Sequence, residues 1–180
     1  MYRFLRRQLD SQKTVALAIE RLNGLSEKDV SSLPMGCSCR FLALSKNIGV
    51  KVYSEQYDRN VSVRMQAKAV KLSLGPLVGK SFRFRWKHGD WKVYHCYLTE
   101  RVQVSSDKRR HSSWTDKLAP VCRQIRTKFA KHRIEANDLW RDNLGRKNGK
   151  FVVIDFNFFE KMSARRQKEY LEELDTGYWD

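Results

Sequence analysis

Apolar residues follow a helical spacing in four segments of the chain. Residues 13–23 and residues 60–76 each place them along one side of a helix, and Gly75-Pro76 is the expected end of the second. A third helix is expected from about Asp116 to Lys131, and a charged one over residues 160–174. The inward-facing positions of the second and third helices are Val61, Met65, Ala69 and Leu72, then Leu118, Val121, Ile125 and Phe129.

Between these helices, apolar and polar residues alternate, as is typical of strands. This pattern predicts two short strands within residues 39–54 and two longer ones within residues 80–100, joined at His88-Gly89-Asp90. After the third helix, a turn at Gly149 is expected to bring residues 150–155 back as a strand.

This order of elements predicts an α+β fold with two unequal lobes and a cleft between them. We expect residues 1–33 to form an N-terminal helical extension and residues 34–102 a strand-rich small lobe with one inserted helix. Residues 103–180 would form a minimal helical lobe with a catalytic-type loop and a hairpin.

Composition narrows the class of protein. The chain has 180 residues, 41% of them apolar, which favours a globular protein with a real core. A net charge of +16 predicts attraction to anionic partners. The apolar run at residues 15–19 is too short to span a membrane. The four cysteines lack the spacing of a disulfide framework or zinc site, so we expect reduced thiols and a cytoplasmic protein.

Three polar side chains suited to metal or proton chemistry lie between Asp138 and Asn157. Asp138 is expected at a tight turn after the third helix, where its carboxylate can project into the cleft. Asn143 follows after one loop, and the turn at Gly149 returns Asp155 to the same edge. An amide oxygen and a carboxylate that converge in this way suit Mg²⁺. A further carboxylate beside them could orient or accept a hydroxyl proton, as phosphoryl transfer requires.

The spacing Asp138-x-x-x-x-Asn143, followed by a hairpin and Asp155-Phe156, resembles the protein-kinase-like superfamily. That superfamily includes aminoglycoside phosphotransferases and short kinase-like proteins of bacteriophages. The resemblance covers roughly residues 34–157 and implies a minimal two-lobed fold. The C-terminal lobe would be truncated, because only 25 residues follow Asp155.

The resemblance implies ATP and Mg²⁺ as cofactors and assigns roles to four residues. Asp138 would be the catalytic carboxylate, and Asn143 and Asp155 would hold the metal. Lys51, in the strand segment "GVKVY", would hold the α and β phosphates.

The same resemblance assigns cofactor-binding roles to three more residues. The segment "YLTERV" resembles the hinge that receives adenine, with backbone groups of Glu100 and Val102. Gln66 falls where the family has the glutamate that pairs with the lysine, and we expect its side chain to face a polar cleft. The other departures from the family pattern are Ala136-Asn137 before the catalytic aspartate, Trp140 for a lysine, Asn157 for the glycine of D-F-G, and a glycine-rich loop reduced to Gly36.

Positive charge is concentrated between Arg101 and Lys150, a segment that contains 14 Lys or Arg residues and only five Asp or Glu residues. This surplus favours an acidic protein as partner or substrate, and nucleic acid is an alternative. The alternation of aromatic and basic residues over 82–87 suits core packing on one face, or base stacking if the aromatic face is exposed. The cations that flank the apolar stripe of the third helix are Arg123, Arg126, Lys128, Lys131 and Arg133.

Three hypotheses about function follow. The first is a Mg²⁺–ATP-dependent phosphotransferase acting on protein hydroxyls, in the host cytoplasm if the chain comes from a bacteriophage. The second is a pseudokinase that binds and modulates an acidic partner protein. The third is a basic nucleic-acid-binding module.

Overall fold

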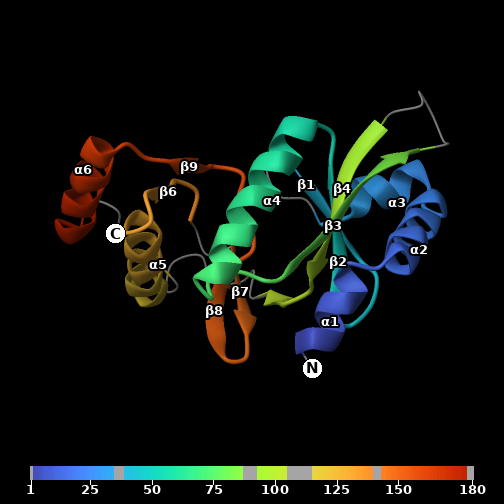
Figure 1. Ribbon diagram of the computed structural model, residues 1–180, viewed down its shortest axis with the longest axis horizontal. Helices are drawn as coiled ribbons and strands as arrows, with labels where there is room; N and C mark the ends of the chain where they lie inside the picture. Colours follow the sequence, from blue (N-terminus) through green and yellow to red (C-terminus); the bar gives the residue numbers. More distant parts are fainter. Residues whose placement is uncertain (1, 35–38, 87–92, 105–114, 140–142, 178–180) are drawn as a thin grey trace.

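The computed structural model describes residues 2–34, 39–86, 93–104, 115–139 and 143–177 (Figure 1). The helices are α1 (Tyr2–Leu9), α2 (Gln12–Asn23), α3 (Glu27–Ser32), α4 (Gln56–Lys71), α5 (Thr115–Ala130) and α6 (Ala164–Asp175). The strands are β1 (Cys39–Ala43), β2 (Ile48–Tyr53), β3 (Val78–Arg85), β4 (Val93–Glu100), β5 (Gln103–Val104), β6 (Ile134–Ala136), β7 (Leu144–Lys147), β8 (Lys150–Val153) and β9 (Phe159–Lys161).

An antiparallel sheet of order β1-β2-β4-β3 dominates the N-terminal part. Ile48, Val50 and Val52 of β2 share a buried cluster with residues of α1 and α2. Successive residues of a strand point to opposite faces, so Lys51 and Tyr53 lie on the other face, toward α4. All six residues of β2 are buried, as expected for a strand covered on both sides.

The C-terminal part is built from α5, α6 and two small sheets, of order β5-β7-β8 and β6-β9. Its core includes Ile125, Phe129 and Phe156, and residues of α4 such as Met65 and Ala69 belong to the same cluster. Helix α4 therefore packs against both parts of the molecule and lies between them in Figure 1. In the described part of the chain, each helix is too short or too polar to traverse a lipid bilayer.

The α+β class predicted from the sequence is confirmed. The predicted helix over residues 60–76 differs at both ends, because α4 begins at Gln56 and ends at Lys71. It ends there because Ser73 adopts a positive φ of 59° and Leu74 N donates to Ala69 O at 2.8 Å. The predicted turn at Gly149 is present, with Asn148 and Gly149 at φ 50° and 76° between β7 and β8.

The alternating hairpin segment 82–87 uses its aromatic face for packing. Phe84 and Trp86 are 4% and 7% exposed, and Phe82 packs against the same cluster. Base stacking requires exposed rings, so this face gives no support to the nucleic-acid hypothesis. The predicted turn at His88-Gly89-Asp90, the loop at Gly36 and Trp140 lie outside the described residues.

Helix α1, which lies in the predicted helical extension but was not delimited from the sequence, packs closely on a bulged part of β3. A Cβ atom at Gly79 would lie 2.5 Å from Leu9 O and 2.7 Å from Leu9 Cβ. Arg6 Nη1 donates to Val78 O at 2.9 Å, and the β3–β4 register shifts between Val78 and Ser81. Glycine at 79 therefore allows α1 to lie against the sheet.

We predict that Gly79→Ala lowers the free energy of unfolding by about 1–3 kcal/mol, because the new methyl group forces α1 away from the sheet. Urea denaturation of wild type and variant measures this loss. Gly24→Ala is the matched control, since a Cβ there meets nothing closer than 3.6 Å and its φ is −78°. Equal stability of Gly79→Ala and Gly24→Ala would show that α1 does not pack on β3 in this way.

Candidate active site

Lys51 projects from β2 toward α4 and is 7% exposed. Its Nζ donates to Ile154 O at 2.5 Å and lies 6.0 Å and 5.8 Å from the ring centroids of Tyr97 and Phe156. Burial alone would lower the pKa of the Lys51 amine, but neighbouring Tyr97, Cys39 and Asp155 outweigh it and raise the pKa above its ordinary value. Lys51 is thus a buried, protonated amine.

A continuous series of hydrogen bonds connects Lys51 to the loop that carries Asp138. Ile154, which accepts from Lys51, donates its own N–H to Asn143 O at 2.8 Å. Asn143 Nδ2 donates to Asp138 O at 2.7 Å and to Asp138 Oδ2 at 3.1 Å. Asp155 follows Ile154 directly in the chain. The structure therefore brings Lys51, Asp138, Asn143 and Asp155 to one place.

The oxygen atoms at this place fit a hard cation such as Mg²⁺. Asp155 Oδ1 is buried and has no hydrogen-bond partner within the described ranges, and the same holds for both polar side-chain atoms of Asn157. Leaving such atoms unpaired costs roughly 1–3 kcal/mol each, which a ligand would offset. The amide nitrogen of Asn143 is turned to Asp138, so its oxygen remains for a cation. A cluster of three or more His, Cys, Asp or Glu residues is not found among the described residues, which leaves a carboxylate–amide set.

Asn157 takes the place of the D-F-G glycine without a strained backbone. Among the described non-glycine residues, positive φ values occur at Ser73, Arg133 and Asn148, and Asn157 is not one of them. The predicted loss of a permissive residue at this position therefore carries no conformational penalty here.

Gln66 does not face a polar cleft, and that prediction is wrong. Its side chain is fully buried, at 0% exposure. Its Nε2 donates to Pro76 O at 3.0 Å and to Thr99 Oγ1 at 2.7 Å, and its Oε1 accepts from Tyr97 OH at 2.8 Å. The amide thus fastens α4 to the sheet, and Tyr97 stands between it and Lys51.

Tyr97 belongs to a buried chain of neutral hydroxyl groups. Tyr53 OH donates to Ser62 Oγ at 2.8 Å, and Ser62 Oγ lies 3.0 Å from Tyr97 OH. Burial raises the pKa of the Tyr97 phenol, which therefore remains a hydrogen-bond donor. Its proton is directed to Gln66, so Ser62 donates to Tyr97. This chain fixes the ring that lies beside Lys51.

Glu100 and Val102 lie where the chain passes from the four-stranded sheet to the C-terminal part. Glu100 Oε2 accepts from Lys147 Nζ at 2.6 Å and from Leu77 N at 2.8 Å, and Glu100 N donates to Leu77 O at 2.9 Å. The backbone N–H of Glu100 is therefore already used. Val102 packs against Gly145, where a Cβ would lie 2.7 Å from the Val102 side chain.

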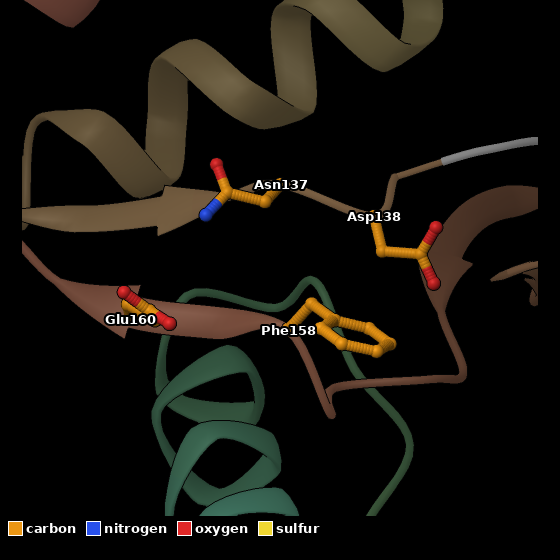
Figure 2. Close-up of a pocket in the computed structure, with 4 residues that line it drawn as sticks. All are labelled: Asn137, Asp138, Phe158 and Glu160. Carbon is orange, nitrogen blue, oxygen red and sulfur yellow. The ribbon is translucent and has the colours of Figure 1, made fainter. Parts of the chain in front are cut away.

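A pocket of about 290 Å³ lies beside Asp138. It is lined by Asn137, Asp138, Phe158 and Glu160, which come from the segment after β6 and from the region of β9 (Figure 2). The Asp138 carboxylate and the Phe158 ring point the same way at one end, and Asn137 and Glu160 lie at the other. An acceptor molecule could approach Asp138 from this pocket.

Arg126 positions the Asp138 loop, a role that the sequence analysis missed. The sequence places Arg126 among the cations that flank the apolar stripe of this helix, but its side chain is buried, at 2% exposure. Its Nη2 donates to Leu139 O at 3.1 Å and its Nε lies 3.5 Å from Ala136 O. These carbonyls flank Asp138 on both sides. The sequence does hold one signal of its burial, because Arg126 lies one helical turn from both Cys122 and Ala130 on the apolar side of the helix.

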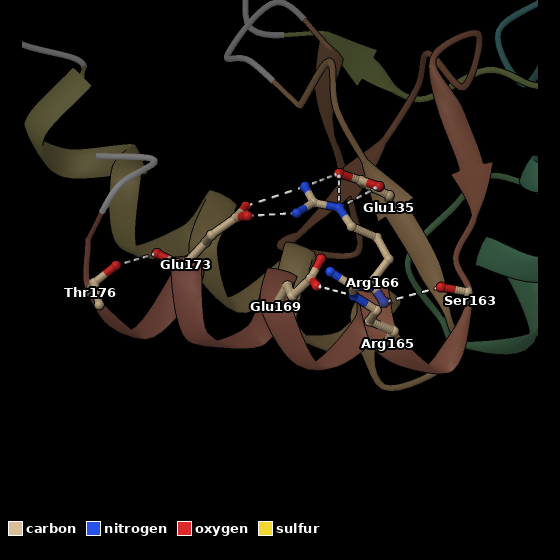
Figure 3. A network of polar contacts seen from close by, with 7 residues as sticks. All are labelled: Glu135, Ser163, Arg165, Arg166, Glu169, Glu173 and Thr176. Atoms are coloured by element: carbon tan, nitrogen blue, oxygen red, sulfur yellow. Dashed lines mark hydrogen bonds and ion pairs between the residues drawn. The ribbon is translucent and has the colours of Figure 1, made fainter.

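Strand β6, which leads into this loop, is held by Arg166 of α6. The Arg166 guanidinium lies between Glu135 of β6 and Glu173 of α6, at 2.5 Å from each carboxylate (Figure 3). Ser163 caps the helix by accepting from Arg166 N at 3.1 Å. The network joins α6 to β6 and so supports the segment that carries Asn137 and Asp138.

Comparison with known proteins gives distant structural likenesses. No protein-family model and no curated protein matches the sequence. Among solved structures, WaaP in complex with acyl carrier protein is similar with a TM-score of 0.49 and 10% identity, covering 92% of this chain and 78% of that one. The Legionella pneumophila LegK7 effector kinase gives a TM-score of 0.42 and 15% identity, covering 88% of this chain and 38% of that one. Both scores are below 0.5, so function must be argued from the residues of this chain.

The burial of Gln66 predicts that Gln66→Glu is strongly destabilising at neutral pH. A carboxylate there would lose the donor bonds to Pro76 and Thr99 and would place a charge in the core. We expect a loss of about 2 kcal/mol or more at pH 7. Burial raises the pKa of the new carboxyl above its unfolded value, so the folded state binds the extra proton and the loss shrinks as the pH falls toward about 4.

Urea denaturation between pH 4 and pH 8 measures this dependence. The control is Gln56→Glu at the exposed start of the same helix, where a negative charge is favourable. A pH-independent stability equal to that of Gln56→Glu would contradict the buried position of Gln66.

Proposed function

We propose that this chain is a Mg²⁺–ATP-dependent phosphotransferase that acts on protein hydroxyl groups. The observation that carries the proposal is the unbroken series of contacts from Lys51 through Ile154 and Asn143 to Asp138, beside a buried Asp155 oxygen without a partner in the described ranges. A buried cation, an oxygen pair for a metal and a carboxylate base are the groups that phosphoryl transfer needs together.

Each residue has a distinct task in this proposal. Lys51 holds the α and β phosphates, exchanging its bond to the Ile154 carbonyl for a phosphate oxygen. Asn143 and Asp155 hold the magnesium, which when bound neutralises charge on the transferred group. Asp138 accepts the proton of the acceptor hydroxyl, and Asn143 Nδ2 keeps its carboxylate oriented. The Val102 backbone meets the base of the nucleotide.

A second candidate is a nucleotide-binding pseudokinase that binds an acidic partner protein. Lys68 of α4 has a pKa lowered by burial and by the nearby cations Lys161 and Arg64. Three cations gathered at the contact between α4 and β9 form a surface that an acidic segment would neutralise. Thermal stabilisation by Mg²⁺–ATP without phosphoryl transfer to any acceptor would favour this candidate.

The two carboxylates of the site should respond differently to mutation. Asp155→Asn should abolish the Mg²⁺ dependence of nucleotide binding, because a neutral amide binds the metal far more weakly. Asp138→Asn should leave nucleotide binding intact and lower turnover about 10²- to 10⁴-fold, because only the proton acceptor is lost. Calorimetric titration with Mg²⁺–ATP and radiolabel transfer from ATP to protein acceptors measure the two effects.

Asp175→Asn, at the exposed end of α6, is the matched control and should behave as wild type. If Asp138→Asn and Asp155→Asn bind and transfer as well as Asp175→Asn, the site is not where we place it. If both unfold, the two carboxylates are structural.

A further inference from the structure

The pocket beside Asp138 combines a carboxylate and an aromatic ring on neighbouring strands. Glu160 lies in β9 opposite Glu135 of β6, and Phe158 directly precedes β9. Figure 2 shows Glu160 at the Asn137 end of the pocket and Phe158 beneath Asp138. The four described lining residues therefore come from two backbone segments that the β6–β9 pairing holds side by side.

No ion pair between Glu160 and a cation is found in the described part of the chain. Its neighbour on the paired strand, Glu135, forms an ion pair with Arg166. Lys161 follows in sequence but points to the opposite face of the strand, where it lies near Lys68. Arg166 neutralises Glu135, so Glu160 is the carboxylate of this cross-strand pair that a cationic group of a ligand can meet.

Phe158 supplies an exposed aromatic ring at the Asp138 end of the pocket. Its side chain is 49% exposed, whereas Phe156 and Phe159 beside it are buried at 0% and 2%. The ring can pack against a ligand beside Asp138, and the Glu160 carboxylate at the other end can pair with an ammonium or guanidinium group. The pocket is thus locally anionic in a chain whose net charge is +16. Salt screens surface charges beyond roughly 8–10 Å, so the nearest groups decide what binds here.

We propose that this pocket selects acceptors whose hydroxyl group stands next to a cationic side chain, namely a serine or threonine flanked by arginine or lysine in a peptide. The inference rests on the proposed function, since Asp138 would receive the hydroxyl while Glu160, at the other end of the pocket, would hold the cation. A peptide fits better than a free amino alcohol, because the pocket is open to solvent at Phe158, which is 49% exposed, so an extended chain can lie across it. An extended chain can gain further contacts outside it.

Two peptides that differ only at the flanking residue test the selection. One carries serine next to arginine, and the other carries citrulline, the neutral analogue of arginine, at the same position. We expect wild type to prefer the arginine peptide about three- to fivefold in kcat/KM, the range of an exposed ion pair. Glu160→Gln should bring this ratio close to one, and Phe158→Leu should keep it, because the ring lies at the Asp138 end of the pocket. Glu20→Gln, at an exposed carboxylate of α2, should keep the wild-type ratio.

The outcomes separate this inference from the proposed function. Equal kcat/KM for both peptides in wild type would overturn the inference and leave the phosphotransferase standing. Transfer to ethanolamine as efficient as transfer to the arginine peptide would overturn the assignment to peptides. If neither peptide is phosphorylated, fluorescence anisotropy of labelled peptides still shows whether the pocket selects a cationic neighbour. Tighter binding of the arginine peptide that is lost in Glu160→Gln supports the pocket, and equal binding of both peptides contradicts it.

Discussion

The hydrogen bond from Lys51 Nζ to the carbonyl of Ile154 connects the two parts of this molecule at the place where chemistry is expected. A buried ammonium group is costly unless acceptors surround it, so the backbone before Asp155 must stay close to β2. That requirement depends in turn on α4, which covers the face of β2 that bears Lys51 and also packs into the C-terminal core. The position of Asp155, and through Asn143 that of Asp138, follows from this contact.

The lysine is supported by a neutral network at the position where the kinase-like family pattern has a glutamate. Gln66 ties Tyr97 to Thr99 and to the Pro76 carbonyl, so α4 is fixed to the sheet by buried hydrogen bonds that salt does not screen. An amide at this position loses the charge-assisted bond to lysine but avoids a second buried charge. The side of the site formed by Tyr97 is therefore held in place by buried hydrogen bonds. The polar partners of the Lys51 amine are the Ile154 carbonyl and Asp155.

Periodicity in the sequence predicted the α+β class, the inward stripe of α5 and the hairpin that returns Asp155 to Asn143. These features follow from local spacing and turn chemistry. The packing of α1, the burial of Gln66 and the role of Arg126 could not be predicted, because each depends on a partner distant in sequence or on carbonyl groups that face inward only in the folded chain. A polar residue on a helix gives the same local signal whether it meets solvent or a buried carbonyl group. Arg126 and Lys128 illustrate this ambiguity on α5.

The most direct measurement is the side-chain ammonium resonance of Lys51 in protein labelled with nitrogen-15 lysine, assigned by its loss in Lys51→Met. The raised pKa keeps this group protonated at neutral pH, and its burial slows exchange with solvent so that the resonance is observable. Titration with ATP in the presence of Mg²⁺ should shift the resonance saturably, because Nζ exchanges the Ile154 carbonyl for a phosphate oxygen, and omission of Mg²⁺ should weaken the response. A resonance that stays unchanged while ATP saturates the protein, or the absence of any ATP binding, would contradict the assignment of this site to phosphoryl transfer.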